Sequence, residues 1–167
     1  MEVTDEGVPV QDLIAVIKDS IKKAGVSAAS DTHDIRVASV RLILKVVASK
    51  SIGGGLDFRV PFIGMKFSTG GKVSTQDTHT IDIQLVPPPP DQERAVRGDV
   101  EQTLVSAIAT IRAVAASARA GDDPWVLSSG TVDISFVITK AGSISLGVEG
   151  ELSHEVTHQL RLGLGPA

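Results

Sequence analysis

The chain has no cysteine and no tyrosine, one tryptophan and four phenylalanines among its 167 residues. Without cysteine there is no disulfide framework, no thiolate metal site and no cysteine nucleophile. Aromatic residues at 3% are too few for a surface on which nucleic-acid bases stack. A net charge of −4 gives no basic footprint for nucleic acid. Disulfide-rich and nucleic-acid-binding proteins are therefore excluded as classes.

Targeting signals and long apolar runs are absent as well. The segment Met1–Gly7 is acidic and lacks a basic region followed by an apolar stretch. No run approaches the roughly 18 consecutive apolar residues of a membrane-spanning helix. We therefore expect a soluble, cytoplasmic protein. A hydrophobic content of 42%, almost all aliphatic, is enough for a packed core.

The most informative feature that is present is an internal repeat of one helix followed by three strands. Both predicted helices carry apolar residues at helical spacing. The first apolar stripe is Val10, Leu13, Ile14, Ile17 and Ile21. The second is Val100, Leu104, Ile108, Ile111 and Ala115. Gly25 and the turn 121–124 are typical helix ends, and Asp99 with Gln102 predicts a capping box.

Alternating apolar residues predict three strands after each helix. The first strands are predicted around 40–46 and 132–138, and the second around 56–62 and 144–148. The third strands, 78–87 and 157–166, both read Thr-His, then alternating apolar residues, then Pro. Pro61 indicates an edge or a bulge, and Trp125 is predicted to be a packing anchor. The same order of elements and the shared Thr-His and Pro favour a tandem duplication.

We therefore predict an α+β fold with units at 8–87 and 99–166, joined by a proline-rich linker at 88–98. One helix over three strands is a small core with an exposed edge. The two units are predicted to pair as a pseudo-dimer, with a six-stranded antiparallel sheet and both helices on one face. The outward side chains of Ile43, Val47 and Val137 are then expected to form an exposed apolar patch.

Several motifs are weighed for chemistry. His154 to His158 is a literal H-E-x-x-H, which needs both histidines on one helical face. Val156 and Thr157 favour a strand, where residues four apart lie about 13 Å from each other. We therefore interpret His158 and its repeat counterpart His79 as structural, and assign no catalytic, cofactor-binding or metal-binding residue. The glycines at 53–55 and 70–71 lack the context of phosphate loops and predict turns.

The ordered combination of these elements resembles a known family, the second trypsin-co-occurring domain of bacterial conflict systems. The resemblance rests on the helix after Val8-Pro9, the strand 40–46, the Gly-rich turn, the segment 71–74, and Thr78-His79 with its closing Pro87. It spans residues 8–87, and 99–166 resembles the family less closely. The resemblance implies a small non-enzymatic recognition or adaptor module found beside trypsin-like proteases and signalling NTPases, with no catalytic residues to carry over.

Two functions of different classes follow, and a third interpretation is a purely structural oligomer, in which the pseudo-dimer forms further homo-oligomers. The first is a non-enzymatic recognition or adaptor module with a protein partner, such as a trypsin-like protease or a signalling NTPase. The alternative is a sensor or carrier of a small ligand, with a pocket between the helices and the sheet. No cofactor is expected under either reading. Charge is uneven: residues 1–90 hold ten acids and ten bases, and residues 91–167 hold ten acids and six bases. This difference favours two units with unlike surfaces.

Overall fold

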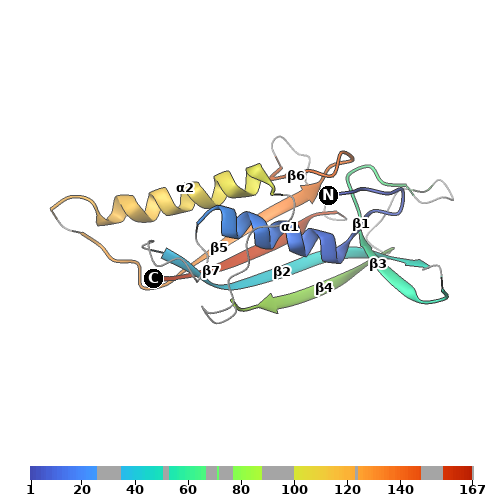
Figure 1. Ribbon diagram of the computed structural model, residues 1–167, viewed down its shortest axis with the longest axis horizontal. Helices are drawn as coiled ribbons and strands as arrows, with labels where there is room; N and C mark the ends of the chain where they lie inside the picture. Colours follow the sequence, from blue (N-terminus) through green and yellow to red (C-terminus); the bar gives the residue numbers. More distant parts are fainter. Residues whose placement is uncertain are drawn as a thin grey trace.

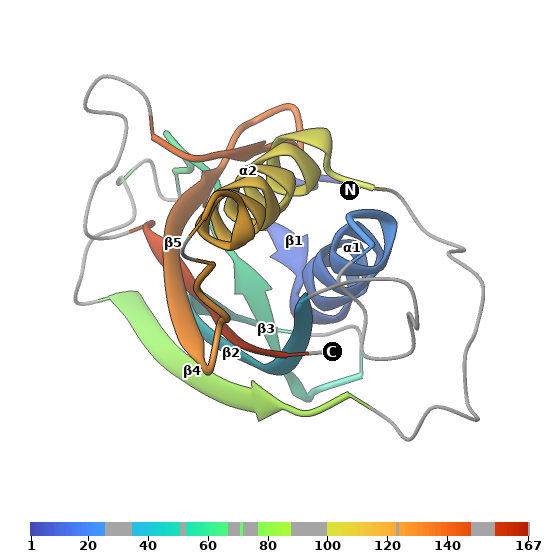
Figure 2. The ribbon, with the colours of Figure 1, turned by 90° about the vertical axis from the view of Figure 1, so that its left-hand side faces the viewer.

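The computed structural model describes residues 1–25, 35–50, 53–66, 71, 77–87, 100–122, 124–147 and 156–166. These form an α+β fold of two layers, with both helices on the concave face of a curved antiparallel sheet (Figures 1 and 2). The sheet has seven strands, one more than predicted. The elements are β1 (Val8–Pro9), α1 (Val10–Lys23), β2 (Ile35–Lys50), β3 (Leu56–Val60), β4 (Thr78–Leu85), α2 (Gln102–Arg119), β5 (Gly130–Ile138), β6 (Ile144–Ser145) and β7 (His158–Pro166).

The two helices form for the reasons that their sequences predict. α1 buries Leu13, Ile17 and Ile21, and ends before Gly25, whose φ of 70° needs a residue without a side chain. α2 buries Leu104 and Ile108 one turn apart. The predicted capping box is not observed, because Glu101 occupies the N-cap without a side-chain cap and Asp99 lies outside the described residues. The apolar stripes of both helices face the sheet.

β2 is the central strand because it is long enough to be paired on both edges at once. One edge pairs with β4 along residues 40–47, and the other pairs with β7 along 35–43. Val47 pairs with Thr78 of β4 and also with Arg59 of β3. β3 must therefore share the β7 edge, so that β7 and β3 lie end to end along β2.

The two units repeat one pattern of strand register. Val46 pairs with His79 in the first unit, and Phe136 pairs with His158 in the second. Subtracting 90 from each residue number in β5 and 79 from each residue number in β7 converts all seven β5–β7 pairs into β2–β4 pairs. This register aligns Val40 with Gly130, two positions from the Val40–Val132 alignment that the sequence predicts. The common element order supports the duplication, which stays a prediction.

The relation between the units differs from a two-fold pseudo-dimer. β2 and β5 are both antiparallel to β7, so these equivalent strands run in the same direction. α1 and α2 also run in the same direction (Figure 1). The junction joins β2 to β7, which are not equivalent, whereas a two-fold axis would join equivalent strands. The second unit is therefore related to the first by a translation across the sheet, without a two-fold rotation.

Several residues are buried or exposed in a way that the sequence does not predict. The core is aliphatic and lies between the helices and the sheet, as predicted. The expected apolar patch is wrong, because Val47 is 2% exposed and Val137 is fully buried, while Ile43 is half-buried. Residues 62–65 bring Phe62 and Met65 beside Val47. Trp125, predicted to be an anchor, is 71% exposed because it precedes β5 where no described strand lies beside it.

Candidate functional site

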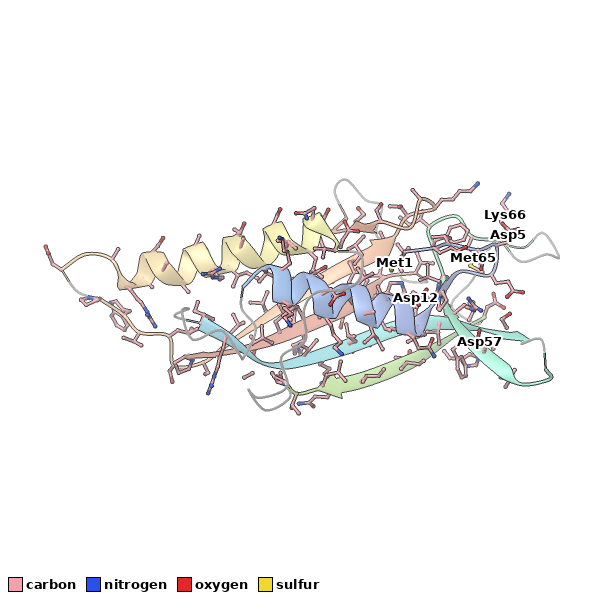
Figure 3. The ribbon with its side chains drawn as sticks, viewed as in Figure 1. Met1, Asp5, Asp12, Asp57, Met65 and Lys66 are labelled. Carbon is pink, nitrogen blue, oxygen red and sulfur yellow. The ribbon has the colours of Figure 1, made fainter. Side chains whose placement is uncertain are left out.

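An open cleft lies at the end of the molecule where the β2–β3 hairpin, the N-terminal segment and residues 61–66 meet (Figure 3). Its volume is about 720 Å³. Three apolar side chains, Val47, Phe62 and Met65, line it and are at most 8% exposed. The cleft is further lined by Asp5, Glu6, Ala48, Ser49, Gly64, Lys66 and Lys140. It therefore combines buried apolar side chains with charged groups of both signs.

Backbone packing fixes the walls of this cleft. A Cβ at Gly7, whose φ is 102°, would lie 2.6 Å from the Val60 carbonyl oxygen, so glycine permits the close approach to β3. At Gly142, whose φ is 83°, a Cβ would collide with the Met1 carbonyl oxygen. The Ile63 N–H donates to the Ile138 carbonyl oxygen at 2.9 Å, which ties the segment after β3 to β5. The cleft is thus built by both units and the N-terminal segment.

The charged side chains of the cleft are available for a ligand. Asp5, Glu6, Lys66 and Lys140 are all exposed, and no ion pair among the described residues joins them. Figure 3 shows Asp5 and Lys66 near each other at this end of the molecule. An extended peptide could place apolar side chains against Met65, whose flexible thioether adapts to varied shapes. Its own charged groups would then meet carboxylates and ammonium groups at the rim.

His158 lies at the junction where β7 and β3 meet, and its side chain is fully buried. The Lys45 backbone N–H donates to Nδ1 of His158 at 3.1 Å, so the imidazole replaces a missing strand partner there. An accepting Nδ1 places the proton of the neutral ring on Nε2, which has no hydrogen-bond partner among the described residues. The ring also packs against Phe136, with 5.3 Å between centroids.

Burial lowers the pKa of His158 to about 4, and the positive charge of Lys45 adds to this shift. The backbone of Pro61 acts in the opposite direction, although its geometry falls short of a hydrogen bond to Nε2. His158 is therefore neutral at physiological pH. The structure supports the structural interpretation of this histidine, because it completes a strand junction.

His79 occupies the matching register position in the first unit, but its environment is different. It is exposed, and its ring meets the edge of Phe58 with 6.1 Å between centroids. The difference arises because β7 lies between two strands, whereas β4 is paired on one edge only. The shared Thr-His sequence thus marks a common place in the fold without giving a common role.

The outer face of the sheet carries two bidentate ion pairs. Arg161 donates to Asp133 with Nε at 2.6 Å, and Arg41 donates to Asp82 with Nε at 2.8 Å. Hydrogen bonds from the arginines lower the pKa of both carboxyl groups. All four side chains are between 41% and 56% exposed, so this row is a solvated face and contributes little to stability.

The motifs weighed in the sequence lie apart from the cleft. His154 and Glu155 of the H-E-x-x-H pattern are outside the described residues, and His158 begins a strand as predicted. The described residues contain no group of three or more potential metal-ligating side chains. Gly54 makes the predicted turn between β2 and β3 with a φ of 82°, while Gly70 is outside the described residues. No helix in the described part of the chain is long and apolar enough to cross a membrane.

The sequence interpretation missed the cleft. Its carboxylates come from the N-terminal segment, its apolar residues from β2 and residues 62–65, and Lys140 from the second unit. Strand pairing, the hydrogen bond from Ile63 to Ile138 and the close approaches at Gly7 and Gly142 bring these distant segments together. The acidic character of Met1–Gly7 was the one local signal, and it argued only against a targeting segment.

The fold defines the class of an α+β domain, here with an open cleft at one end. Residues 8–87 match the family model described as trypsin-co-occurring domain 2. The match ends at Pro87, so the second unit lies beyond it. The family is an accessory domain found together with trypsins. No curated protein and no solved structure matches the chain.

Proposed function

We propose that the protein is a non-enzymatic recognition or adaptor module that binds a protein partner in the cleft between the N-terminal segment and residues 61–66. The observation that carries the proposal is the combination of a buried apolar floor with four exposed charges of both signs at one open site. Such a site suits an extended segment of another protein, which offers side chains of each kind.

The family name favours a particular class of partner. Because the family is described as co-occurring with trypsin, the first candidate is a trypsin-like protease. A signalling NTPase, which the family resemblance also implies, is the second candidate. We further propose that the protein works in the cytoplasm, and that its two units together form one binding site. The alternative of a small-ligand pocket between helices and sheet has less support, because apolar side chains such as Leu13, Leu44 and Leu160 fill that space.

The test measures binding of the purified chain to a purified trypsin-like protease or NTPase encoded beside it. Lys66→Glu and Lys140→Glu each reverse one exposed charge of the cleft. We expect each to weaken binding about tenfold, which corresponds to about 1.4 kcal/mol. Lys18→Glu, an equally exposed reversal on α1, is the matched control and should leave the Kd unchanged. Equal affinities for all three variants, or no binding to either partner, would refute the proposal.

A further inference from the structure

The two outer edges of the sheet have no strand partner among the described residues. β4 pairs with β2 only, and β5 pairs with β7 and, at its last two residues, with β6. β4 is eight residues long, contains no lysine, and reaches its first proline only at Pro87. Natural edge strands are usually short, charged or interrupted by proline, because open edges pair with other chains. Within the described residues, the outer edges of residues 80–85 in β4 and 130–136 in β5 therefore carry no strand.

The junction inside the chain shows how these two edges fit each other. By strand register, β4 is the counterpart of β7, and β5 is the counterpart of β2. The internal junction is the pairing of β2 with β7. The same pairing between two molecules would join β5 of one copy to β4 of the next. We propose that copies of this chain associate head to tail by this pairing, independently of the cleft.

The segment before β5 supplies the first argument. The beginning of β2 pairs with the end of β7, and there Ile35 and Val37 are 4% and 2% exposed. A shift of 90 positions places Trp125 and Leu127 at the corresponding positions. Trp125 is 71% exposed and its neighbour Val126 is 72% exposed. At Trp125 the second unit thus exposes an apolar side chain where its counterpart Ile35 is buried, while Val126 corresponds to Arg36, which is exposed within the internal junction.

The end of β4 supplies the matching surface. Internal pairs join Ile35 to Pro166, Arg36 to Gly165 and Val37 to Leu164. Applying both shifts gives the pairs expected between two copies, which are Trp125 with Pro87, Val126 with Val86, and Leu127 with Leu85. Val86 is 73% exposed. Val86 and Val126, which belong to opposite edges of the sheet, are therefore predicted to lie directly opposite each other.

Geometry also decides between a closed pair and a chain of copies. β4 and β5 lie at opposite edges of the sheet, so they cannot pair with each other within one molecule. The two contacting surfaces differ, which makes the interface heterologous and leaves one free edge at each end of any complex that does not close into a ring. Asp82 and Asp133 approach across such a junction, but each is already paired with an arginine. Association should therefore continue beyond the dimer.

The experiment measures the mass of the full chain by sedimentation velocity over a micromolar to submillimolar range. We expect the wild-type mass to rise with concentration beyond that of a dimer. Val86→Asp and Val126→Asp each place a charge on one surface, and because both residues are exposed the fold should remain intact. Each variant alone should be monomeric. Leu56→Asp is the control and should associate like the wild type. Leu56 is as exposed as Val86 but lies in β3, beside the end of β2 that is far from the proposed junction.

Mixing gives the decisive result for a heterologous junction. Val86→Asp retains the surface at Val126, and Val126→Asp retains the surface at Val86, so the two variants should form a one-to-one dimer that does not grow. A wild-type chain that stays monomeric would overturn the proposal. It would also be overturned if only Val86→Asp prevented association, since this result indicates pairing of β4 with β4. These outcomes do not depend on whether the cleft binds a protease or an NTPase.

Discussion

The stability of the protein should fall in mild acid because of one buried side chain, His158. Its pKa is about 4 in the folded protein and near 6.5 in an unfolded chain. The unfolded state therefore binds more protons between these values, and stability rises with pH across that window. The contribution is complete above about pH 6.5 and declines as the pH falls towards 4. The shift implies a loss of about 2 kcal/mol between about pH 7.5 and about pH 5.

The assay is urea unfolding at several pH values in this range, comparing the wild type with His158→Asn. Asparagine retains a carbonyl oxygen that can accept from the Lys45 N–H but does not titrate. His158→Asn should be less stable at pH 7.5, because packing against Phe136 is lost, but its stability should change less towards pH 5. His79→Asn, at the exposed counterpart, should follow the wild type. If the wild type and His158→Asn show the same pH dependence, the buried neutral histidine is refuted.

Two further predictions concern contacts within the core and the sheet. Ser20→Ala should cost about 1–3 kcal/mol in urea unfolding, because Ser20 Oγ accepts from the Glu101 N–H at 2.9 Å in a buried position. Ser20 Oγ also donates to the Val16 carbonyl oxygen, and on an exposed helix face Ser117 Oγ donates to the Ala113 carbonyl oxygen in the same way. Ser117→Ala is therefore the control and should cost far less. Gly7→Ala should cost about 1–3 kcal/mol more than Gly54→Ala, because the new Cβ at Gly7 would lie 2.6 Å from the Val60 carbonyl oxygen. Gly54 also has a positive φ but open space around its Cβ, so equal effects of the two glycine variants would contradict this packing.

The sequence predicts the elements of this fold well because their apolar residues are periodic and local. The helical stripe through Leu13 and Ile17 and the alternation around Leu42 each identify one buried face. Strand neighbours cannot be predicted in the same way, because the pairing of β2 with β7 joins segments more than 100 residues apart. The shift between the units and the cleft both depend on that pairing.

Individual misplaced residues follow from the same long-range contacts. Val47 is on the outward side of β2, yet the segment after β3 buries it. Trp125 has a large apolar side chain of the kind found in cores, yet it precedes β5 at a place where no described strand lies beside it. Ser20 interrupts an apolar stripe, and its role depends on the start of α2. In each case a contact distant in sequence decides the environment, and no local pattern reports it.

The cleft and the residues proposed to join two copies lie at opposite ends of the molecule, and this arrangement has a consequence for binding. The end of β4 and the segment before β5 are far from Asp5 and Lys66 (Figures 1 and 3). Because the internal junction keeps equivalent strands in one direction, head-to-tail association would orient every copy alike. All clefts would then lie at the same end of the joined strands. Such an array binds a multivalent partner more tightly than one cleft does, by as much as 10²–10⁴-fold in linked systems. Single-site affinity and assembly would thus be separable, with Lys66→Glu reducing the first and Val126→Asp the second.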